Sequence, residues 1–405
     1  MAPATSRPSA ARQSSLRETN LAVLTRTLFA SGGGLSRADL AVRTGLTRAT
    51  VSRLCQELIE AGIVDEHEQD VATGPGRPAT PLHPARRTLA GLGFEVNIDY
   101  MAGRSLDLAG TVLGEFKVPG SFADSDPAAV LPQLGELAAD LVETTRATGA
   151  RIVGTHLALP GLVDATATTL LFAPNLGWRS VRPVGLLGNR FRALGAEVRV
   201  ANDAKLQALA AATQGPGGEA KPSTFLYVSG DIGIGSAIIV DGEISGGQHG
   251  WAGELGHVSI EPFGPLCHCG SRGCLERYAG KTAVLEVAQL PPTTPSADVL
   301  RRLEIGEERV HRAVARAGWA LGIAIADALN LLDLSDVVLG TGLAPLVPWL
   351  EPSLRRELAT RVLAAQFVDI SVVGAPEDPC PASTGGALRA LQSVISRPAA
   401  WIPGD

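Results

Sequence analysis

Four potential metal ligands, concentrated in one short segment of the 405-residue chain, constrain its fold more than any other feature. Cys267, Cys269 and Cys274 fall within eight positions, and His257 precedes the first of them by ten. One imidazole nitrogen and three thiolate sulfurs form a closed tetrahedral ligand set for Zn²⁺. Because no ligand position is left open, the sequence predicts one structural zinc ion per chain rather than a catalytic one.

The residues around these ligands fit the same interpretation. Gly270 and Gly273 supply the sharp turns that the chain needs to bring four ligands together in so short a span. His268 is a competing ligand, but it stands between two cysteines and its side chain is predicted to point away. The alternative is a group of free buried thiols. Cys55 and Cys380 are predicted to be ordinary core or surface residues.

Polar residues suited to a sugar surround the predicted zinc loop. Glu254 precedes His257 by three residues, and Glu276 follows the last cysteine by two. Asn202 and Asp203 stand at the end of a predicted strand and the start of a predicted helix. Sugar hydroxyls both donate and accept hydrogen bonds, so carboxylates and an amide bind them well. The alternative for Asp203 is a helix N-cap with no further role.

Residues 36–61 are predicted to form two helices joined by a tight turn at Gly45. Ser36 and Thr47 are suited to capping the helices. Five apolar residues at helical spacing hold the helices together: Leu40, Leu46, Val51, Leu54 and Leu58. The residues predicted to face phosphates and base edges are Ser36, Thr47, Arg48, Ala49, Thr50, Ser52 and Arg53. An ordinary helical hairpin with a charged surface is the alternative.

The segment that follows favours DNA binding. Residues 63–84 show the pattern of a short strand, a loop and a second short strand, and the loop contains Gly74-Pro75-Gly76-Arg77-Pro78. A narrow, stiff tip with one guanidinium suits an A·T-rich minor groove, where negative potential is concentrated. The helices and this wing together predict a winged helix-turn-helix that binds double-stranded DNA, with Arg77 in the minor groove.

The bulk properties agree with a multidomain globular protein. The chain is long enough for two or three domains. Residues 1–92 carry 11 basic and 8 acidic side chains, whereas the whole chain has a net charge of −6. A nucleic-acid module joined to an acidic body would show this distribution, and so would a solvated surface. No run of about 18 apolar residues and no apolar signal core are present, so neither a membrane span nor export is predicted, and a cytoplasmic location is expected.

The sequence also predicts domain bounds and elements. Residues 1–15 are predicted to be a disordered arm, 16–88 the winged helix-turn-helix and 89–397 an α/β effector domain. Two strands are expected within 91–118, and a last helix is expected to begin at Gly385-Gly386. The other expected elements are helices at 128–148, 203–213 and 307–332 and strands at 151–159, 197–201, 224–240 and 337–339.

Several motifs together resemble those of the ROK family (repressors, open reading frames and sugar kinases), in the regulator branch that includes xylose and N-acetylglucosamine repressors. The resemblance extends from about Thr19 to Leu391. Its motifs are Glu254-x-x-His257, Cys267-x-Cys269-Gly270-x-x-Gly273-Cys274-x-Glu276, Leu159-Pro160-Gly161-Leu162-Val163-Asp164, Ala173-Pro174-Asn175-Leu176-Gly177-Trp178 and Asn202-Asp203-Ala204.

This resemblance implies an actin-like fold of two α/β lobes with the ligand in the cleft between them. It implies sugar contacts from Gly161, Asn202, Asp203, Glu254, His257 and Glu276. In kinase members, the residue that matches Asp203 is the general base for the sugar hydroxyl. A homodimer or dimer of dimers is expected, because paired recognition helices read palindromic sites.

Two departures separate this chain from the kinases of the family. Kinase members carry Asp-x-Gly-Gly-Thr where this chain has Glu95-Val96-Asn97-Ile98-Asp99, and a second phosphate loop contains Asp231. Lost amide contacts and two repelling carboxylates should weaken nucleotide binding. The predicted function is therefore a repressor of carbohydrate uptake or catabolism genes, released from operator DNA by a sugar or sugar phosphate. The alternatives are an ATP-dependent sugar kinase and a DNA-binding protein whose cleft has lost its ligand.

Overall fold

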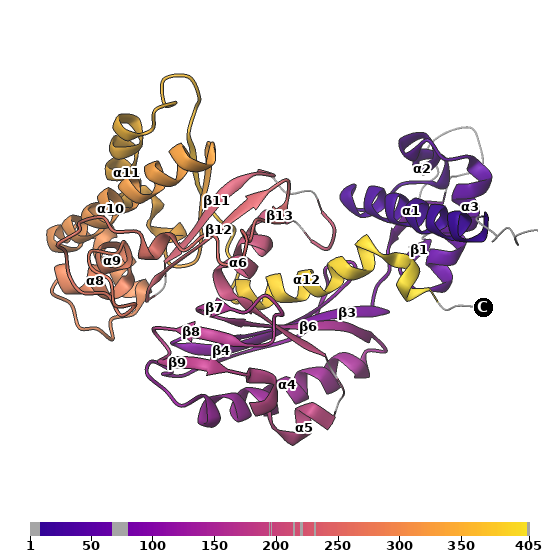
Figure 1. The fold of residues 1–405 in the computed structure, drawn as a ribbon, viewed down its shortest axis with the longest axis horizontal. Coiled ribbons are helices and arrows are strands. Elements are labelled where there is room, and N and C mark those ends of the chain that lie inside the picture. The colour runs from indigo at the N-terminus through magenta and orange to yellow at the C-terminus, as the bar shows by residue number, and fades with distance from the viewer. Residues whose placement is uncertain are drawn as a thin grey trace, which may run out of the picture.

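The computed structural model describes residues 9–66, 80–193, 195, 197–213, 215–218, 222–230 and 232–402 (Figure 1). The N-terminal module consists of α1 (Ser9–Ala30), α2 (Arg37–Thr44), α3 (Arg48–Glu60), β1 (Val64–Glu66) and β2 (Leu82–Pro84). The two strands pair antiparallel, and this pairing gives the module its winged helix-turn-helix architecture. The predicted wing tip with Arg77 lies outside the described residues.

The predicted caps of the two helices are present. Ser36 and Asp39 form a capping box at the start of α2, because the Ser36 hydroxyl accepts from the Asp39 amide while the Asp39 carboxylate accepts from the Ser36 amide. Thr47 caps α3 by accepting from the amide of Thr50. Gly45 ends α2 with a φ of 71°, a left-handed conformation that favours glycine.

The first lobe is built on a five-stranded sheet in the order β10-β6-β3-β4-β5. Its strands are β3 (Leu89–Val96), β4 (Tyr100–Asp107), β5 (Val112–Pro119), β6 (Arg151–Leu159) and β10 (Val198–Asn202). β3, β4 and β5 pair antiparallel, and β6 and β10 add in parallel. Helix α4 (Pro127–Ala147) covers the outer face. The smaller elements are β7 (Leu162–Val163), β8 (Leu170–Ala173), β9 (Trp178–Val181), η1 (Pro183–Leu186) and α5 (Gly188–Ala193).

The second lobe repeats the five-stranded plan in the order β13-β12-β11-β14-β15. Its strands are β11 (Phe225–Gly230), β12 (Ile234–Val240), β13 (Glu243–Ile244), β14 (Asp336–Leu339) and β15 (Ser371–Gly374). The remaining elements are η2 (Leu255–His257), α7 (Glu276–Ala279), α8 (Lys281–Val287), α9 (Ser296–Glu304), α10 (Glu308–Leu332), η3 (Ala344–Leu346) and α11 (Val347–Arg361). Helix α10 shares a core with β11 and β14.

Two helices, α6 (Asp203–Ala212) and α12 (Pro381–Ser396), lie between the two sheets (Figure 1). Glycines allow α12 to approach the backbone of its neighbours closely. A Cβ on Gly385 of α12 would lie 1.8 Å from the carbonyl oxygen of Leu206 on α6. A Cβ on Gly93 of β3 would lie 1.8 Å from the carbonyl oxygen of Ser383 on α12. The prediction that the last helix begins at Gly385 is therefore wrong. The helix begins at Pro381, and the glycines serve the contact of α12 with its neighbours.

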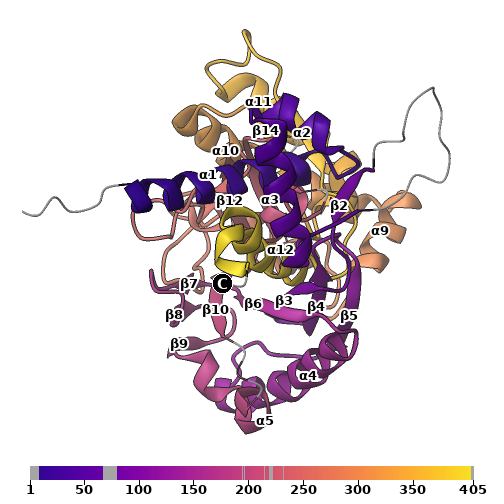
Figure 2. The same cartoon turned by 90° about the vertical axis from the view of Figure 1, so that its right-hand side faces the viewer.

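The N-terminal module shares a hydrophobic core with the first lobe. Leu21, Leu24 and Leu28 of α1 are fully buried, in one cluster with Leu391 and Ile395 of α12. Figure 2 shows the module in front of the end of α12, and η4 (Pro398–Trp401) follows that helix. The position of α1 is therefore tied to that of α12.

Two further predictions are corrected by the structure. Residues 91–118 contain three strands rather than two, because β5 pairs with β4 after a short turn. Helix α1 begins at Ser9, so the part of the predicted disordered arm that the structure describes is helical. Helix α10 is long and apolar enough to cross a membrane by length and composition, but 67% of its most apolar stretch is buried within the protein. This burial is typical of a core helix.

Candidate functional site

A small cavity of about 90 Å³ lies between the two lobes. Its lining includes every residue predicted to contact a sugar, namely Gly161, Asn202, Asp203, Glu254, His257 and Glu276. Gly161 follows β6, and Asn202 ends β10. Glu254 and His257 belong to the second lobe, at η2, so both lobes contribute to one site. Because ligand cavities usually measure about 300–1,000 Å³, a sugar would have to widen the cleft.

Asn202 holds the first-lobe side of the cavity in place. Its side-chain amide donates to the carbonyl oxygen of Gly161 at 3.1 Å, and its oxygen accepts from the amide of Lys205 at 3.1 Å. Asn202 is thus the N-cap of α6, and Asp203 is the first residue of the helix. The capping role considered for Asp203 belongs to Asn202, which leaves Asp203 at the cavity wall.

Glu254, which lines the cavity, and Lys205 carry opposite charges that interact electrostatically. Burial raises the pKa of the Glu254 carboxyl, and the nearby His257 and Lys205 oppose that rise. Burial lowers the pKa of the Lys205 amine, while Glu254 opposes that change. The Lys205 ammonium also donates to the carbonyl oxygen of Gly250. This pairing places a carboxylate with reduced access to water at the cavity, where it can accept strongly from a hydroxyl.

The four predicted metal ligands converge. The ligand atoms of His257, Cys267, Cys269 and Cys274 all lie within 4.8 Å of one another. The sulfurs of Cys269 and Cys274 are 3.7 Å apart, and that of Cys267 is 3.9 Å from Nδ1 of His257. At a Zn–S bond of about 2.3 Å, two tetrahedral sulfur ligands lie about 3.8 Å apart. The cluster therefore has the dimensions of a metal site.

The loop that carries the cysteines folds as its glycines require. Gly270 and Gly273 have φ values of 95° and 70°. A Cβ on Gly273 would lie 1.7 Å from the carbonyl oxygen of Glu261, so only glycine fits there. His268 points away from the ligands, with Nδ1 3.4 Å from Oδ1 of Asn175. The prediction that His268 is not a ligand agrees with this geometry.

His257 connects the metal site to the cavity. Its Nδ1 atom faces the sulfur of Cys267, so Nε2 is the ring nitrogen left for another partner. Glu276 has a similar double position, because its Oε1 lies 3.0 Å from the sulfur of Cys267 while the residue lines the cavity. A metal ion held by the cluster would fix the ring of His257. Cys267 would lose its proton on becoming a metal ligand, so the hydrogen bond that its thiol donates to Glu276 would be lost.

Sequence reasoning missed several polar residues of the cavity. Asn175, Gln207 and Ser229 line it, and Lys205 interacts electrostatically with Glu254. Asn175 belongs to one of the family motifs, and its amide side chain could have been predicted to contact a sugar for that reason. Gln207 lies one turn after Asp203 and accepts from the hydroxyl of Tyr227 at 3.2 Å. No sequence pattern distinguishes it from an ordinary helix residue.

The hairpin of β3 and β4 carries side chains where the kinases of the family have glycines that bind phosphate. Ile98 is buried in the turn between β3 and β4, and Asn97 accepts from the amide of Ile98 at 2.6 Å. The carboxylate of Asp99 lies 3.7 Å from the ammonium of Lys281 on α8. An ion pair between the lobes thus occupies this position. Asp231, in the second loop, lies outside the described residues.

The surface predicted to contact DNA is exposed on α3. Arg48, Ala49, Ser52 and Arg53 are exposed there, as is the N-cap Thr47, while Thr50 is half-buried. The guanidinium of Arg53 donates to Glu57 at 2.6 Å, and Glu57 also accepts from Arg17 of α1 at 2.5 Å. Arg48 has no ion-pair partner among the described residues. The Ser36 hydroxyl is engaged in its capping box.

Comparison with known proteins supports both parts of the chain. The ROK family sequence profile matches residues 99–389, and that of the MarR family matches residues 28–72. The xylose repressor of Bacillus spizizenii is 26% identical over 329 residues, which cover 81% of this chain and 83% of the relative. The DNA-binding transcriptional dual regulator NagC of Escherichia coli K12 is 27% identical over 354 residues, covering 84% and 85%.

One solved structure resembles nearly the whole chain. It is described as a ROK family transcriptional regulator homologous to the E. coli MLC protein, with a TM-score of 0.78, 24% identity and coverage of 96% of this chain and 100% of that one. This likeness supports the two-lobed fold with its attached N-terminal module. Since the family profile spans well over half of the sequence, this chain belongs to the ROK family.

Proposed function

We propose that this protein is a DNA-binding repressor of carbohydrate uptake or catabolism genes that a sugar or sugar phosphate releases from its operator. The observation that carries the proposal is the continuous packing from the cavity to the DNA-binding module. Asp203 at the cavity begins α6, and α6 packs against α12 through Gly385. The second half of α12 shares a core with α1. A change in lobe separation would thereby move α1.

The polar groups of the cavity support a sugar as the effector. Carboxylates of Asp203, Glu254 and Glu276 accept from hydroxyls, and Nε2 of His257 and the amide of Asn175 add further partners. The resemblance to xylose and N-acetylglucosamine repressors makes xylose, N-acetylglucosamine and their phosphates the first sugars to test. A thermal-shift screen of these compounds, followed by operator titration with the best stabiliser, tests the proposal. If no sugar changes operator affinity, the proposal is wrong.

We further propose the components that this function needs. Zn²⁺ is the metal that suits three thiolates and one imidazole, and its role is structural because the four protein ligands complete a tetrahedron. Residues 16–88 form the DNA-binding domain, and residues 89–397 form the effector domain. A homodimer or a dimer of dimers in the cytoplasm would pair two recognition helices on a palindromic operator.

The recognition helix gives a direct prediction. Arg48→Ala is expected to weaken operator binding by about 1–3 kcal/mol and to make the salt dependence shallower if the lost contact is to a phosphate. Arg53→Ala is expected to act in the same direction, although this side chain must first share or leave Glu57. Fluorescence anisotropy at several salt concentrations measures both effects. Arg312→Ala on α10, far from the module, is the matched control. If Arg48→Ala and the control bind the operator with equal affinity, the prediction that Arg48 of α3 contacts the DNA is wrong.

The same cleft is expected to transfer no phosphate. The alternative of a sugar kinase requires a glycine-rich first hairpin, and here Ile98 fills the turn while Asp99 and Lys281 pair across the lobes. Asp203 is therefore a vestigial base rather than a catalytic one. A coupled assay for ADP release, with the sugar that binds best and with Mg²⁺-ATP, should remain at background. Sugar-dependent ADP formation that is lost in Asp203→Asn would restore the kinase alternative.

A further inference from the structure

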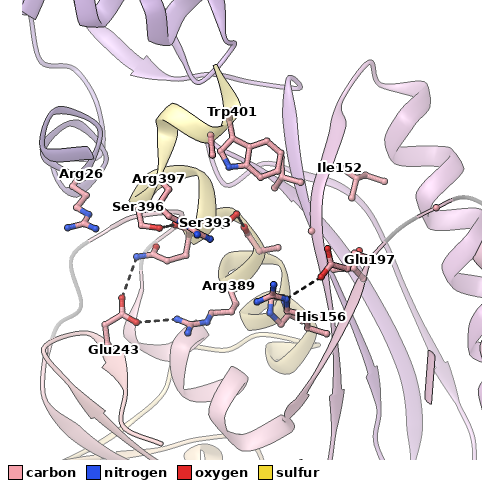
Figure 3. A pocket seen from close by; sticks show the side chains of 18 of the residues that line it. Arg26, Ile152, His156, Glu197, Glu243, Arg389, Ser393, Ser396, Arg397 and Trp401 are labelled. Carbon is pink, nitrogen blue, oxygen red and sulfur yellow. Dashed lines mark hydrogen bonds and ion pairs between the residues drawn. The ribbon is translucent and has the colours of Figure 1, made fainter. Parts of the chain in front are cut away.

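A second, larger cavity lies where the DNA-binding module meets the first lobe. It measures about 930 Å³ and is bounded by α1, β6, β10, the second half of α12 and η4 (Figure 3). None of its lining residues comes from α2 or α3, so it is separate from the predicted recognition surface. We call this cavity the junction basin. Its walls belong to both domains, because Arg26 lies on α1 and the other walls belong to the effector domain.

The junction basin is strongly basic, although the protein as a whole carries a net charge of −6. Its lining contains two glutamates, Glu197 and Glu243, against five exposed arginines: Arg26, Arg146, Arg199, Arg389 and Arg397. Arginines therefore outnumber glutamates among the lining residues. Like charges gathered without full compensation repel each other, so such a cavity favours an anion.

The acidic residues compensate only part of this charge. Arg389 donates to Glu243 at 3.2 Å, and the guanidinium of Arg199 lies 3.6 Å from Glu197 (Figure 3). Arg26 and Arg397 have no ion-pair partner among the residues that the structure describes. Arg26 of α1 and Arg397, which follows α12, can therefore bond an anion without first breaking an internal ion pair. Arg389 and Arg199 would share their guanidinium groups between the anion and their glutamates.

His156 is a further polar residue in the wall of the basin. His156 of β6 lines the basin beside Arg389 (Figure 3), and its Nδ1 is buried with no hydrogen-bond partner. Burial lowers the pKa of His156 to about 4, with Arg389 and Arg199 contributing. The ring is therefore neutral near pH 7. Buried polar atoms in proteins nearly always have a partner, so the unpaired Nδ1 is an unusual polar atom in this wall, although it is shielded from the solvent in the basin.

We propose that the junction basin binds a small anion with two or more phosphate or carboxylate groups. The planar guanidinium fork recognises both groups through paired hydrogen bonds. The volume of the basin matches that of small-molecule sites, about 300–1,000 Å³. The anion would bridge Arg26 of α1 to Arg389 of α12 and Arg199 of β10, and so fix the DNA-binding module on the effector domain. This last consequence rests on the proposed function, whereas the binding site does not.

The test uses the full chain and inorganic pyrophosphate as the probe, in isothermal titration calorimetry at low ionic strength. Wild type is expected to bind one pyrophosphate per chain, more weakly as salt increases. The double variant Arg199→Gln with Arg389→Gln is expected to raise the Kd by about tenfold or more, because charge-assisted hydrogen bonds are lost. Arg26→Gln, which changes only the α1 side, is expected to weaken binding as well. Arg312→Gln, an equally exposed arginine on α10, is the matched control.

Two results would overturn the proposal. The first is the absence of saturable pyrophosphate binding, or binding that the basin variants and the control affect equally. The second concerns DNA as the source of the phosphates. If the double variant weakens operator binding as much as Arg48→Ala does, in buffer without other polyanions, the basin contacts the DNA backbone instead. Glu254→Gln changes the cleft and not the basin, so this variant should retain pyrophosphate binding. It therefore distinguishes an error in the proposed basin site from an error in the proposed sugar response.

Discussion

Replacement of Cys269 by serine is expected to remove the bound metal and unfold the loop that carries Glu254 and His257. Wild type should contain about one Zn²⁺ per chain by elemental analysis, and the variant close to none, because a hydroxyl is a poor substitute for a thiolate ligand. A ligand present at about 1,000 times its Kd stabilises the folded state by about 4 kcal/mol. The variant should lose a contribution of that order, measured as a lower midpoint of thermal unfolding, together with its sugar response.

His268→Ala is the control for this experiment. His268 lies between Cys267 and Cys269 in the sequence, yet its ring faces Asn175 rather than the cluster. The control should therefore keep both its zinc and its thermal midpoint. A wild-type protein that is fully stable after purification without metal would contradict a structural zinc. So would retention of zinc by the Cys269 variant.

The sugar that binds best is expected to lower the operator affinity of wild type by about 1–3 kcal/mol, which is the usual range for coupling between two sites. The variant Glu254→Gln should bind the operator as wild type does and should not respond to the sugar. Its amide keeps the size of the side chain beside Lys205, but the charge-assisted bond to a hydroxyl is lost. Operator titration with and without the sugar, for both proteins, measures the coupling.

Linkage supplies an independent check on this result. If the sugar weakens DNA binding by some factor, operator DNA must weaken sugar binding by the same factor. Glu286→Gln, an exposed glutamate on α8 of the same lobe, is the matched control and should respond like wild type. If Glu254→Gln and wild type respond to the sugar alike, the effector binds outside the cleft.

The features that the sequence predicts well depend on neighbours along the chain. A capping box joins Ser36 to Asp39, and the buried stripe of α3 repeats at helical spacing. The four candidate metal ligands span 18 positions, and the three cysteines among them are connected through the turns at Gly270 and Gly273. Such patterns are local, so sequence reasoning reaches them without knowledge of the tertiary structure.

The family motifs also predicted residues of the cleft correctly, since the six residues predicted to contact a sugar line one cavity. Their spatial arrangement could not be derived from spacing alone. Gly161 and Glu254 come from different lobes, and only the packing of α6 and α12 between the two sheets brings those lobes together. The predicted start of the last helix was wrong for the same reason, because Gly385 serves a contact with Leu206 rather than a helix end.

The sequence by itself, with its family motifs, therefore determined the candidate metal ligands, the helix-turn-helix and the residues of the candidate sugar site. Tertiary structure decided how these parts are joined. Leu24 of α1 and Leu391 of α12 are 367 positions apart, yet they lie in one core. The arginines of the junction basin, from Arg26 to Arg397, look like scattered surface charges in the sequence. Long-range packing has no local signature, because each apolar or basic residue is compatible with many partners until the chain has folded.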